Sequence, residues 1–410
     1  TINRLLIIFL FCYFNQSNAQ NEDCNCKTDL IHLNSKIKKT PSYKLNKEDY
    51  SVLYKKSLEQ AETQTSTYDC FVLLNKLLVS LNDNHCKIFG IDQAAVAEVL
   101  NNPEKLQAFK NSSAFKIFPR PSLNLDSLKS ALSAMPNEDI QGVYSRKGYM
   151  SIGVYKDIKL DDYRAIVLKS ESNIWEKGEV IYTLVPYGNN YILAIGGGIT
   201  SKRLIAYPER IEQGFFLTMG FQKDISKTNY SQAPYPDSTY VRKEISLDIT
   251  YLKVGSFNSW YPTLADAEKF YKSLEGTLTK KNVIIDLRDN GGGGNRNSDG
   301  LLEIIEDYIT NNNVYILTNN RTASNAEQFT FKLKKYANLK TFGQRTSGTV
   351  AYELKDGNFV LPCGNYIAVL TSKKHSEFLE IESVGIEPDV ELDINSDWLD
   401  QVITIIKEKN

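Results

Sequence analysis

The stretch "NVIIDLRDNGGGGNRNSDG", residues 282–300, decides the fold of the C-terminal half. It opens with a short apolar run and passes through four consecutive glycines, residues 291–294. A strand without polar alternation is typical of a parallel sheet that is covered on both faces. The apolar residues that follow recur on one face of a helix: Leu301, Ile304, Ile305 and Tyr308. The stretch therefore predicts a strand, a glycine loop and a helix.

Two more units of this kind flank it. "ITYLKVGSF" precedes a helical pattern with Leu264, Ala267, Tyr271 and Leu274 on one face, and "NVYILT" precedes one with Ala326, Phe329, Leu333 and Ala337. Repeated strand-helix units predict an α/β core with a mostly parallel sheet. Such sheets place their functional loops at the carboxyl ends of the strands.

The rest of the chain has other textures. Residues 20–110 are predicted to be a helical N-terminal domain, because the Leu-rich run Tyr68–Leu81 contains neither Gly nor Pro. Short β-branched runs broken by Gly and Asn predict a β-rich middle domain over residues 111–245. Residues 246–410 hold the strand-helix units. The chain is thus a multidomain α+β protein with an α/β core.

The first nineteen residues read as a secretory signal peptide. One Arg precedes an uncharged apolar run, Leu5–Phe14, and Ser17-Asn18-Ala19 forms a small-x-small cleavage pattern. A membrane span needs about 20 apolar residues, so none is expected in the mature chain. Phe11 before Cys12 disfavours a lipid anchor. We expect export to a periplasm or beyond the cell.

Export permits disulfides, and five cysteines follow the cleavage pattern: Cys24, Cys26, Cys70, Cys86 and Cys363. One must stay unpaired. Cys24 and Cys26 are candidates to tie the N-terminal segment to Cys70 and Cys86, with the connectivity open. A zinc site lacks a second closely spaced Cys or His pair, so we expect neither metal nor cofactor. The net charge of -1 gives no footprint for nucleic acid or an anionic membrane.

Three loops at the predicted strand ends carry the chemistry. The glycine loop lacks the Gly-Lys-Ser/Thr ending of a phosphate cradle, so it is either a flexible turn or a donor loop for an oxyanion. In "NNRTASNAEQF" Ser324 stands at a predicted helix start, where it either caps the helix or faces a substrate. The N–H of Asn325 would then help to hold an oxyanion. The acidic run "FLEIESVGIEPDVEL" is either a solvated loop or the source of a carboxylate that orients a base.

Together these motifs resemble the carboxyl-terminal-processing (tail-specific) serine peptidase family, which includes the tricorn core protease. The resemblance rests on D-L-R-D-N-G-G-G, T-N-N-R-T-A-S-N-A-E-Q-F, G-Q-R-T-S-G and E-S-V-G-I-E-P-D, in that order, and covers Ile249–Leu392 with an outlying "LNDNHCKI". It implies a crotonase/ClpP-like core. It also implies that Ser324 is the nucleophile, with an oxyanion hole formed by Gly291 or Gly292 and by Asn325.

The base distinguishes two branches of this family. Thr349 stands where the processing-protease branch has its Lys, which disfavours a Ser/Lys dyad. The tricorn-like branch has a His in an L-x-D-x-H motif and an acidic residue before a G-V-x-P-D turn. By resemblance these are His85 and Glu382, although Glu380 would lie on the same side of a strand. A neutral imidazole is suited to activate a serine at ordinary pH.

The remaining candidates receive structural roles. His32 and His375 lie in polar surroundings and are expected at the surface. Asp286 and Arg288 are expected to form an ion pair that braces the glycine loop, with Asn290 as a turn residue.

The predicted function is a secreted serine endopeptidase acting on polypeptides by acyl transfer through Ser324, His85 and Glu382. The alternatives are an inactive peptide- or lipid-binding relative and a secreted esterase. The middle domain is either a distinct β-rich module or a degenerate PDZ domain. The substrate and the oligomeric state stay open.

Overall fold

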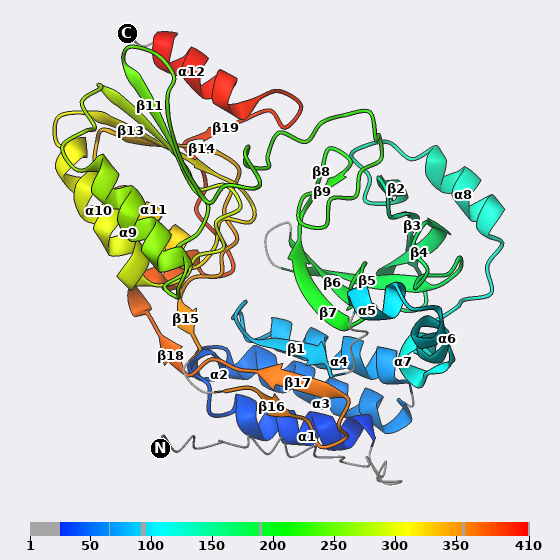
Figure 1. Ribbon diagram of the computed structural model, residues 1–410. Coiled ribbons are helices and arrows are strands. Elements are labelled where there is room, and N and C mark those ends of the chain that lie inside the picture. The colour runs from blue at the N-terminus through cyan, green and yellow to red at the C-terminus, as the bar shows by residue number, and fades with distance from the viewer. Residues whose placement is uncertain (1–24, 65, 92–95, 188–190, 355–356, 409–410) are drawn as a thin grey trace, which may run out of the picture.

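Three parts make up the computed structural model, which describes residues 25–64, 66–91, 96–187, 191–354 and 357–408 (Figure 1). The core sheet and its helices lie on one side, a second sheet lies opposite, and the first helices lie below both. The predicted signal peptide, residues 1–19, falls outside the described residues. Among the described residues, no helix has the length and apolar character required to cross a membrane.

The core is a six-stranded sheet in the order β10-β11-β12-β13-β14-β19. Its strands from β11 onward pair in parallel, and only β10 is antiparallel to its neighbour. This confirms the predicted α/β class with a mostly parallel sheet. The strands are β10 Tyr240–Glu244, β11 Ile249–Val254, β12 Asn282–Asp286, β13 Asn313–Thr318, β14 Leu339–Gly343 and β19 Val390–Glu391.

Helices cover both faces of this sheet because its strands are apolar on both sides. Val283 and Ile285 pack against helices α9, α10 and α11, whereas Ile284 packs toward α12. The predicted apolar faces are correct except at Ala337, which lies beyond the end of α11. The helices are α9 Thr263–Leu274, α10 Asn295–Ile309, α11 Asn325–Leu333 and α12 Trp398–Glu408.

The middle of the chain folds into a six-stranded antiparallel sheet in which each strand pairs with the next. Frequent turns between short apolar runs produce this simple strand order. The sequence pattern of short β-branched runs indicated such strands. Its strands are β2 Gly142–Arg146, β3 Met150–Asp157, β4 Asp162–Ser170, β5 Val180–Tyr187, β6 Tyr191–Gly197 and β7 Leu204–Glu209, followed by the hairpin β8 Ile211–Glu212 and β9 Phe215–Phe216.

The front of the chain is helical, and helices also occupy residues 113–116 and 125–133, within the range predicted to be β-rich. A disulfide joins Cys26 to Cys70, so it ties α1 to α4. Cys86 is free and buried, which corrects its expected part in the cross-link. The helices are α1 Cys26–Ile37, α2 Pro41–Leu45, α3 Lys47–Thr63 and α4 Thr67–Val79, then α5 Val96–Leu100, α6 Pro103–Asn111, α7 Ser113–Lys116 and α8 Leu125–Ser133.

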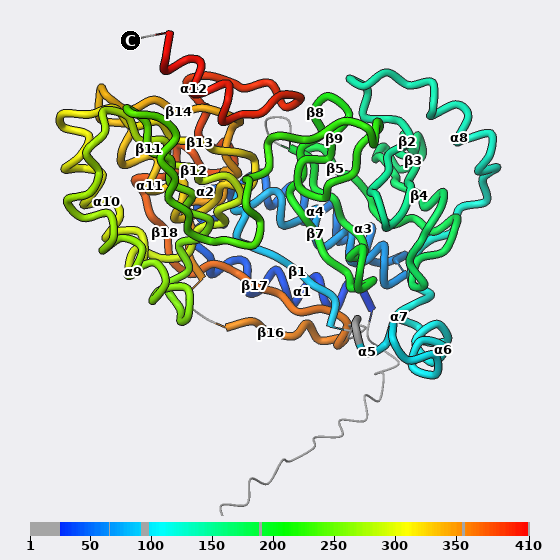
Figure 2. Tube along the Cα trace, turned by 45° about the horizontal axis from the view of Figure 1, so that its top comes forward, coloured from blue at the N-terminus to red at the C-terminus, as the bar shows by residue number. Residues whose placement is uncertain are grey.

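Between β14 and β19 the chain leaves the core and returns to the front segment. There β17 pairs antiparallel with β1, Lys87–Gly90, and with β16 (Figure 2). This pairing brings the turn before β1 to the edge of the core. The elements of this excursion are β15 Tyr352–Glu353, β16 Phe359–Val360, β17 Tyr366–Val369, β18 Lys373–Lys374 and the 3-10 helix η1 Ser376–Ile381.

Candidate active site

Ser324 lies between β13 and α11 in an unusual backbone conformation. Its φ is 55° and its ψ is -122°, whereas an ordinary N-cap residue has extended backbone. A non-glycine residue at positive φ costs about 1–3 kcal/mol and persists only where its surroundings enforce it. The Ser324 N–H donates to Thr349 O at 2.8 Å and to a Glu327 carboxylate oxygen at 3.0 Å. A capping role at the start of α11 therefore does not by itself explain the backbone conformation of Ser324.

The glycine loop lies directly against this turn. A Cβ on Gly292, whose φ is 91°, would lie 2.8 Å from Ser324 Cβ and 2.8 Å from the Asn325 nitrogen. Only glycine allows this approach. The Gly292 N–H donates to Asn290 Oδ1 at 2.9 Å, whereas the N–H groups of Gly291 and Asn325 have no hydrogen-bond acceptor among the described residues. Both N–H groups are therefore available to donate to a ligand.

The predicted brace of the glycine loop is present. The buried Asp286 carboxylate accepts from Arg288 Nε at 2.9 Å and from Nη2 at 2.6 Å. Asn290 does more than turn the chain, because its Nδ2 also donates to Val254 O at 2.9 Å. These contacts hold the loop at the carboxyl ends of β11 and β12.

His85 lies in the turn between α4 and β1. Its backbone N–H donates to Asp83 Oδ1 at 3.1 Å, and its Nδ1 is buried and has no hydrogen-bond partner among the described residues. Burial, followed by the positive charge of Lys87, lowers the pKa of His85 to about 4. The imidazole is therefore neutral at ordinary pH, as a general base must be.

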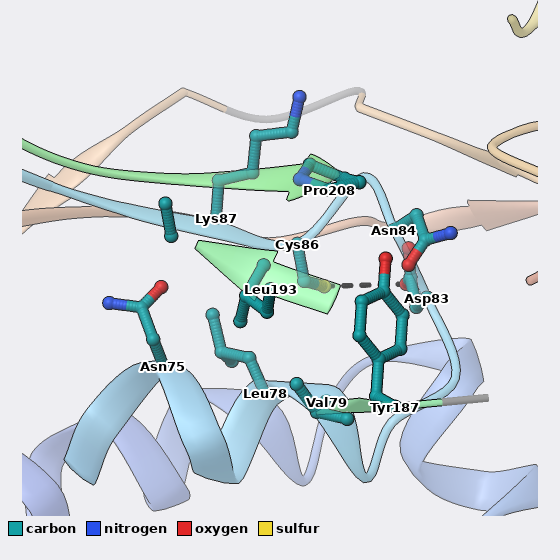
Figure 3. Close-up of a pocket in the computed structure, with 11 residues that line it drawn as sticks. Asn75, Leu78, Val79, Asp83, Asn84, Cys86, Lys87, Tyr187, Leu193 and Pro208 are labelled. Carbon is teal, nitrogen blue, oxygen red and sulfur yellow. Dashed lines mark hydrogen bonds between the residues drawn. The ribbon is translucent and has the colours of Figure 1, made fainter. Parts of the chain in front are cut away.

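The turn is anchored on both sides. Asp83 Oδ2 accepts from Cys86 Sγ at 3.3 Å and from the Thr371 hydroxyl, which follows β17. Figure 3 shows Cys86 directed at Asp83, and Tyr187 lines the same pocket beside the turn. Asp83 was not singled out from the sequence, although the L-x-D-x-H pattern contains it.

Glu382 lies beside His85. One ring nitrogen of His85 and one carboxylate oxygen from each of Asp83 and Glu382 lie within 4.8 Å of one another. Burial raises the pKa of Glu382 to about 8, and the backbone N–H groups of Ala351, Val350 and Asn84 oppose that shift by donating to its carboxylate.

Glu380, the alternative carboxylate, is exposed. The expected strand is the 3-10 helix η1, so Glu380 and Glu382 do not share one side. His375, expected at the surface, is half-buried and contacts Glu353 at 2.9 Å through Nε2.

One loop, residues 346–351, connects the two halves of the site. Thr349 O accepts from Ser324, Val350 and Ala351 donate to Glu382, and Asn84 Nδ2 donates to Gly348 O at 3.0 Å. Ser324 and the His85 ring share no hydrogen bond in the described part of the chain. Catalytic hydrogen bonds often tighten only when substrate is bound.

Glu327 holds this loop against Ser324 and was missed in the sequence. Its buried carboxylate accepts from the Thr346 hydroxyl at 2.6 Å, from Gly348 N at 2.7 Å, from Thr349 N at 3.0 Å and from Ser324 N. The S-x-x-E spacing of a capping box was the available signal.

A cation is a poor occupant for the Asp83–His85–Glu382 cluster. Each carboxylate already accepts hydrogen bonds through both of its oxygens. A cation would have to displace those donors, which are mostly backbone N–H groups. The donor set therefore favours a hydrogen-bonded site over a metal centre.

Comparisons with known proteins find a family similarity for part of the chain. The profile of peptidase family S41 matches residues 295–392. No curated protein matches the sequence.

Among solved structures, mature CPAF complexed with lactacystin is 11% identical with a TM-score of 0.45, over 93% of this chain and 98% of that one. The photosystem II D1 C-terminal processing protease is 14% identical with a TM-score of 0.37, over 93% and 97%. The tricorn protease is 15% identical with a TM-score of 0.39, over 94% and 37%. Residues 295–392, which include Ser324 and Glu382, are thus similar to peptidase family S41.

Proposed function

We propose that the protein is an exported serine endopeptidase in which Ser324 is the nucleophile, His85 the general base and Glu382 the group that orients the imidazole. The observation that carries this proposal is the strained backbone of Ser324 beside a glycine loop and a helix N-terminus. Strain at a serine between a strand and a helix is a known way to expose a nucleophilic hydroxyl.

The chemistry follows from these positions. His85 takes the Ser324 proton as the hydroxyl attacks a peptide carbonyl, and it later gives that proton to the leaving amine. The N–H groups of Asn325 and of the glycine loop, with Gly291 the unengaged donor there, stabilise the oxyanion. Water then attacks the acyl-enzyme, with His85 again as the base, and releases the second product. Glu382 orients the imidazole in each half-reaction and, in its ionised form, stabilises the imidazolium.

Export is part of the proposal. The Cys26–Cys70 disulfide supports it, because disulfides persist in oxidising compartments such as a periplasm or the cell exterior. The expected substrate is a polypeptide.

A fluorophosphonate probe tests the nucleophile directly. We expect it to label the wild type at Ser324, and we expect Ser324→Ala and His85→Ala to lose labelling. Ser273→Ala and His32→Ala are matched controls, because Ser273 is exposed on α9 and His32 lies on α1. Loss of the nucleophile or base lowers kcat by several orders of magnitude in serine hydrolases.

Substrate class is tested by turnover. Cleavage of peptides in preference to simple esters supports a peptidase, whereas hydrolysis of esters alone supports an esterase. Absence of labelling at every pH, with the protein folded, contradicts the hydrolase and leaves a binding protein on the same fold.

A further inference from the structure

One end of the middle sheet contacts the loop that joins the two halves of the site, residues 346–351. Tyr187 ends β5 and Tyr191 begins β6, and these two residues pair across the strands. The buried Tyr191 hydroxyl donates to Thr346 O, and the ring centroids of Tyr187 and Tyr191 lie 5.8 Å apart. Tyrosines at this end of the sheet therefore lie next to the candidate active site.

Tyr187 carries a hydrogen-bond donor without an acceptor. Its hydroxyl is buried, and nothing in the described part of the chain forms a hydrogen bond with it. Burial, followed by Tyr191 and Glu382, raises the pKa of Tyr187, so the hydroxyl keeps its proton and can donate. Unpaired buried donors are rare in folded proteins, and each one needs an explanation.

Asn84 carries a matching acceptor. Its backbone N–H donates to Glu382 Oε1 at 3.1 Å and its Nδ2 donates to Gly348 O at 3.0 Å, whereas its Oδ1 accepts from no residue that the structure describes. Asn84 and Tyr187 line the same pocket beside the turn of His85 (Figure 3). An unengaged donor and an unengaged acceptor thus share one small pocket.

A water molecule fits between these two groups. The pocket leaves about 40 Å³ for the centres of water molecules, and one buried water needs about 10–15 Å³. Such a water typically makes about three hydrogen bonds. Tyr187 and Asn84 supply two partners, and Asp83, which also lines the pocket, supplies a third. The rest of the wall is mostly apolar, and Asn75, its other amide, lies at the opposite end from Tyr187 (Figure 3).

We propose that Tyr187 is a positioning residue for the general base. Its hydroxyl donates through a water molecule to Asn84 Oδ1. Asn84 in turn donates to Glu382 and to Gly348 O, so a fixed amide fixes the turn that carries His85. The middle sheet thereby holds the base in place. This proposal rests on the proposed function for the role of His85.

Tyr187→Phe tests the proposal, because it removes the hydroxyl and keeps the ring. We expect the second-order rate of fluorophosphonate labelling to fall about threefold to tenfold, the effect of one net hydrogen bond. Tyr182→Phe is the matched control. Tyr182 lies on the same strand, and its buried hydroxyl likewise has no partner within the described ranges. The control should label like the wild type.

Asn84→Ala removes the proposed acceptor and keeps the backbone N–H that donates to Glu382. Adding Tyr187→Phe to Asn84→Ala should lower the labelling rate no further, because the two groups act through one water-bridged contact. Additive losses in the double variant overturn the proposal.

A spectroscopic readout separates positioning from stability. The chain has 3 histidines, so NMR of protein with isotope-labelled histidine gives few ring signals, and the His85 signal is the one lost in His85→Ala. Tyr187→Phe should shift the His85 signal and leave those of His32 and His375 in place. Tyr182→Phe should shift none of them. A lowered Tm with an unshifted His85 signal means that the Tyr187 hydroxyl only supports the fold, and it overturns the proposal.

In a wild type that reacts with the probe, either an unchanged labelling rate or an unshifted His85 signal in Tyr187→Phe overturns the proposal. Failure of the proposed function is a separate result. The wild type would then escape the fluorophosphonate probe, while Tyr187→Phe would still shift the His85 signal.

Discussion

The glycine loop can lie against Ser324 only because Gly292 has no side chain. Because a Cβ on Gly292 would also meet Ala323 O at 2.7 Å, Gly292→Ala must push the glycine loop away from Ser324. We expect the rate of fluorophosphonate labelling to fall about 100-fold or more, the size of effect seen when one oxyanion donor is lost. The measurement is the second-order labelling rate of the folded variant.

Gly300→Ala is the control for that substitution. Gly300 lies in α10 with ordinary helical backbone, and a Cβ there would meet only Tyr271 at 3.5 Å. It should label like the wild type and gain up to about 1 kcal/mol in stability from helix propensity. Normal labelling of Gly292→Ala would show that the loop takes no part in the reaction.

The charge state of His85 predicts the pH dependence. Because burial lowers its pKa to about 4, the base stays neutral well below its ordinary value of 6.5, and the acid limb of the labelling rate should lie near pH 4. Between these values the unfolded chain binds a proton at His85 that the folded chain does not, so the contribution of His85 to stability falls as the pH drops through this window, whereas Glu382, with its raised pKa, contributes in the opposite direction.

Lys87 provides the test of that assignment. Its positive charge lowers the pKa of His85, so Lys87→Gln should move the acid limb toward higher pH. Lys55→Gln, on the exposed side of α3, should leave the limb in place. A limb at the ordinary histidine value in the wild type, or one that Lys87→Gln does not move, would exclude a buried His85 as the titrating base.

At the scale of elements, what the sequence could predict depends on how local the signal is. The strand-helix units from β11 to α11 are predictable because each apolar face repeats within a few residues. The pairing of β17 with β1 is not predictable in this way, because the paired residues Lys87 and Val369 lie far apart in the sequence. The same holds for Glu327, whose sequence reads as a helix cap while its carboxylate also holds the distant Gly348 loop.

Pairing of β1 with β17 positions His85 through one side-chain contact. The Thr371 hydroxyl donates to the buried Asp83, which in turn accepts the His85 N–H. Thr371→Val leaves Asp83 with one donor fewer, and we expect a stability loss of about 1–3 kcal/mol. We also expect kcat to fall more than KM changes, because Thr371 acts through the position of the base. Steady-state kinetics and thermal unfolding measure both.

Thr310→Val is the matched change at the exposed end of α10 and should affect neither quantity. If Thr371→Val lowers Tm while kcat is preserved, then Asp83 supports the fold and the His85 turn is held by other contacts, such as Asn84 on Glu382.

At the scale of the molecule, the proposed site joins residues from two ends of the chain. His85 belongs to the helical front segment, whereas Ser324 and Glu382 belong to the core, so the site exists only while the front segment stays docked. The Cys26–Cys70 disulfide restrains that segment by closing a loop with a sequence separation of 44. The stability of the front segment should therefore set the upper temperature limit of activity.

The double variant Cys26→Ser/Cys70→Ser should lose about 2–5 kcal/mol of stability, the usual effect of removing a native disulfide. Labelling should fail at a lower temperature than in the wild type and before the core unfolds. The reason is that the front segment, which carries His85, separates from Ser324 first. The measurement compares labelling with tryptophan fluorescence during heating in a Trp175→Phe/Trp260→Phe background, which leaves Trp398, buried in the core beside β14, as the fluorophore. Each single variant should cost about as much as the double, because either one breaks the bond. Simultaneous loss of labelling and of the core signal would mean that the front segment and the core unfold as one cooperative unit.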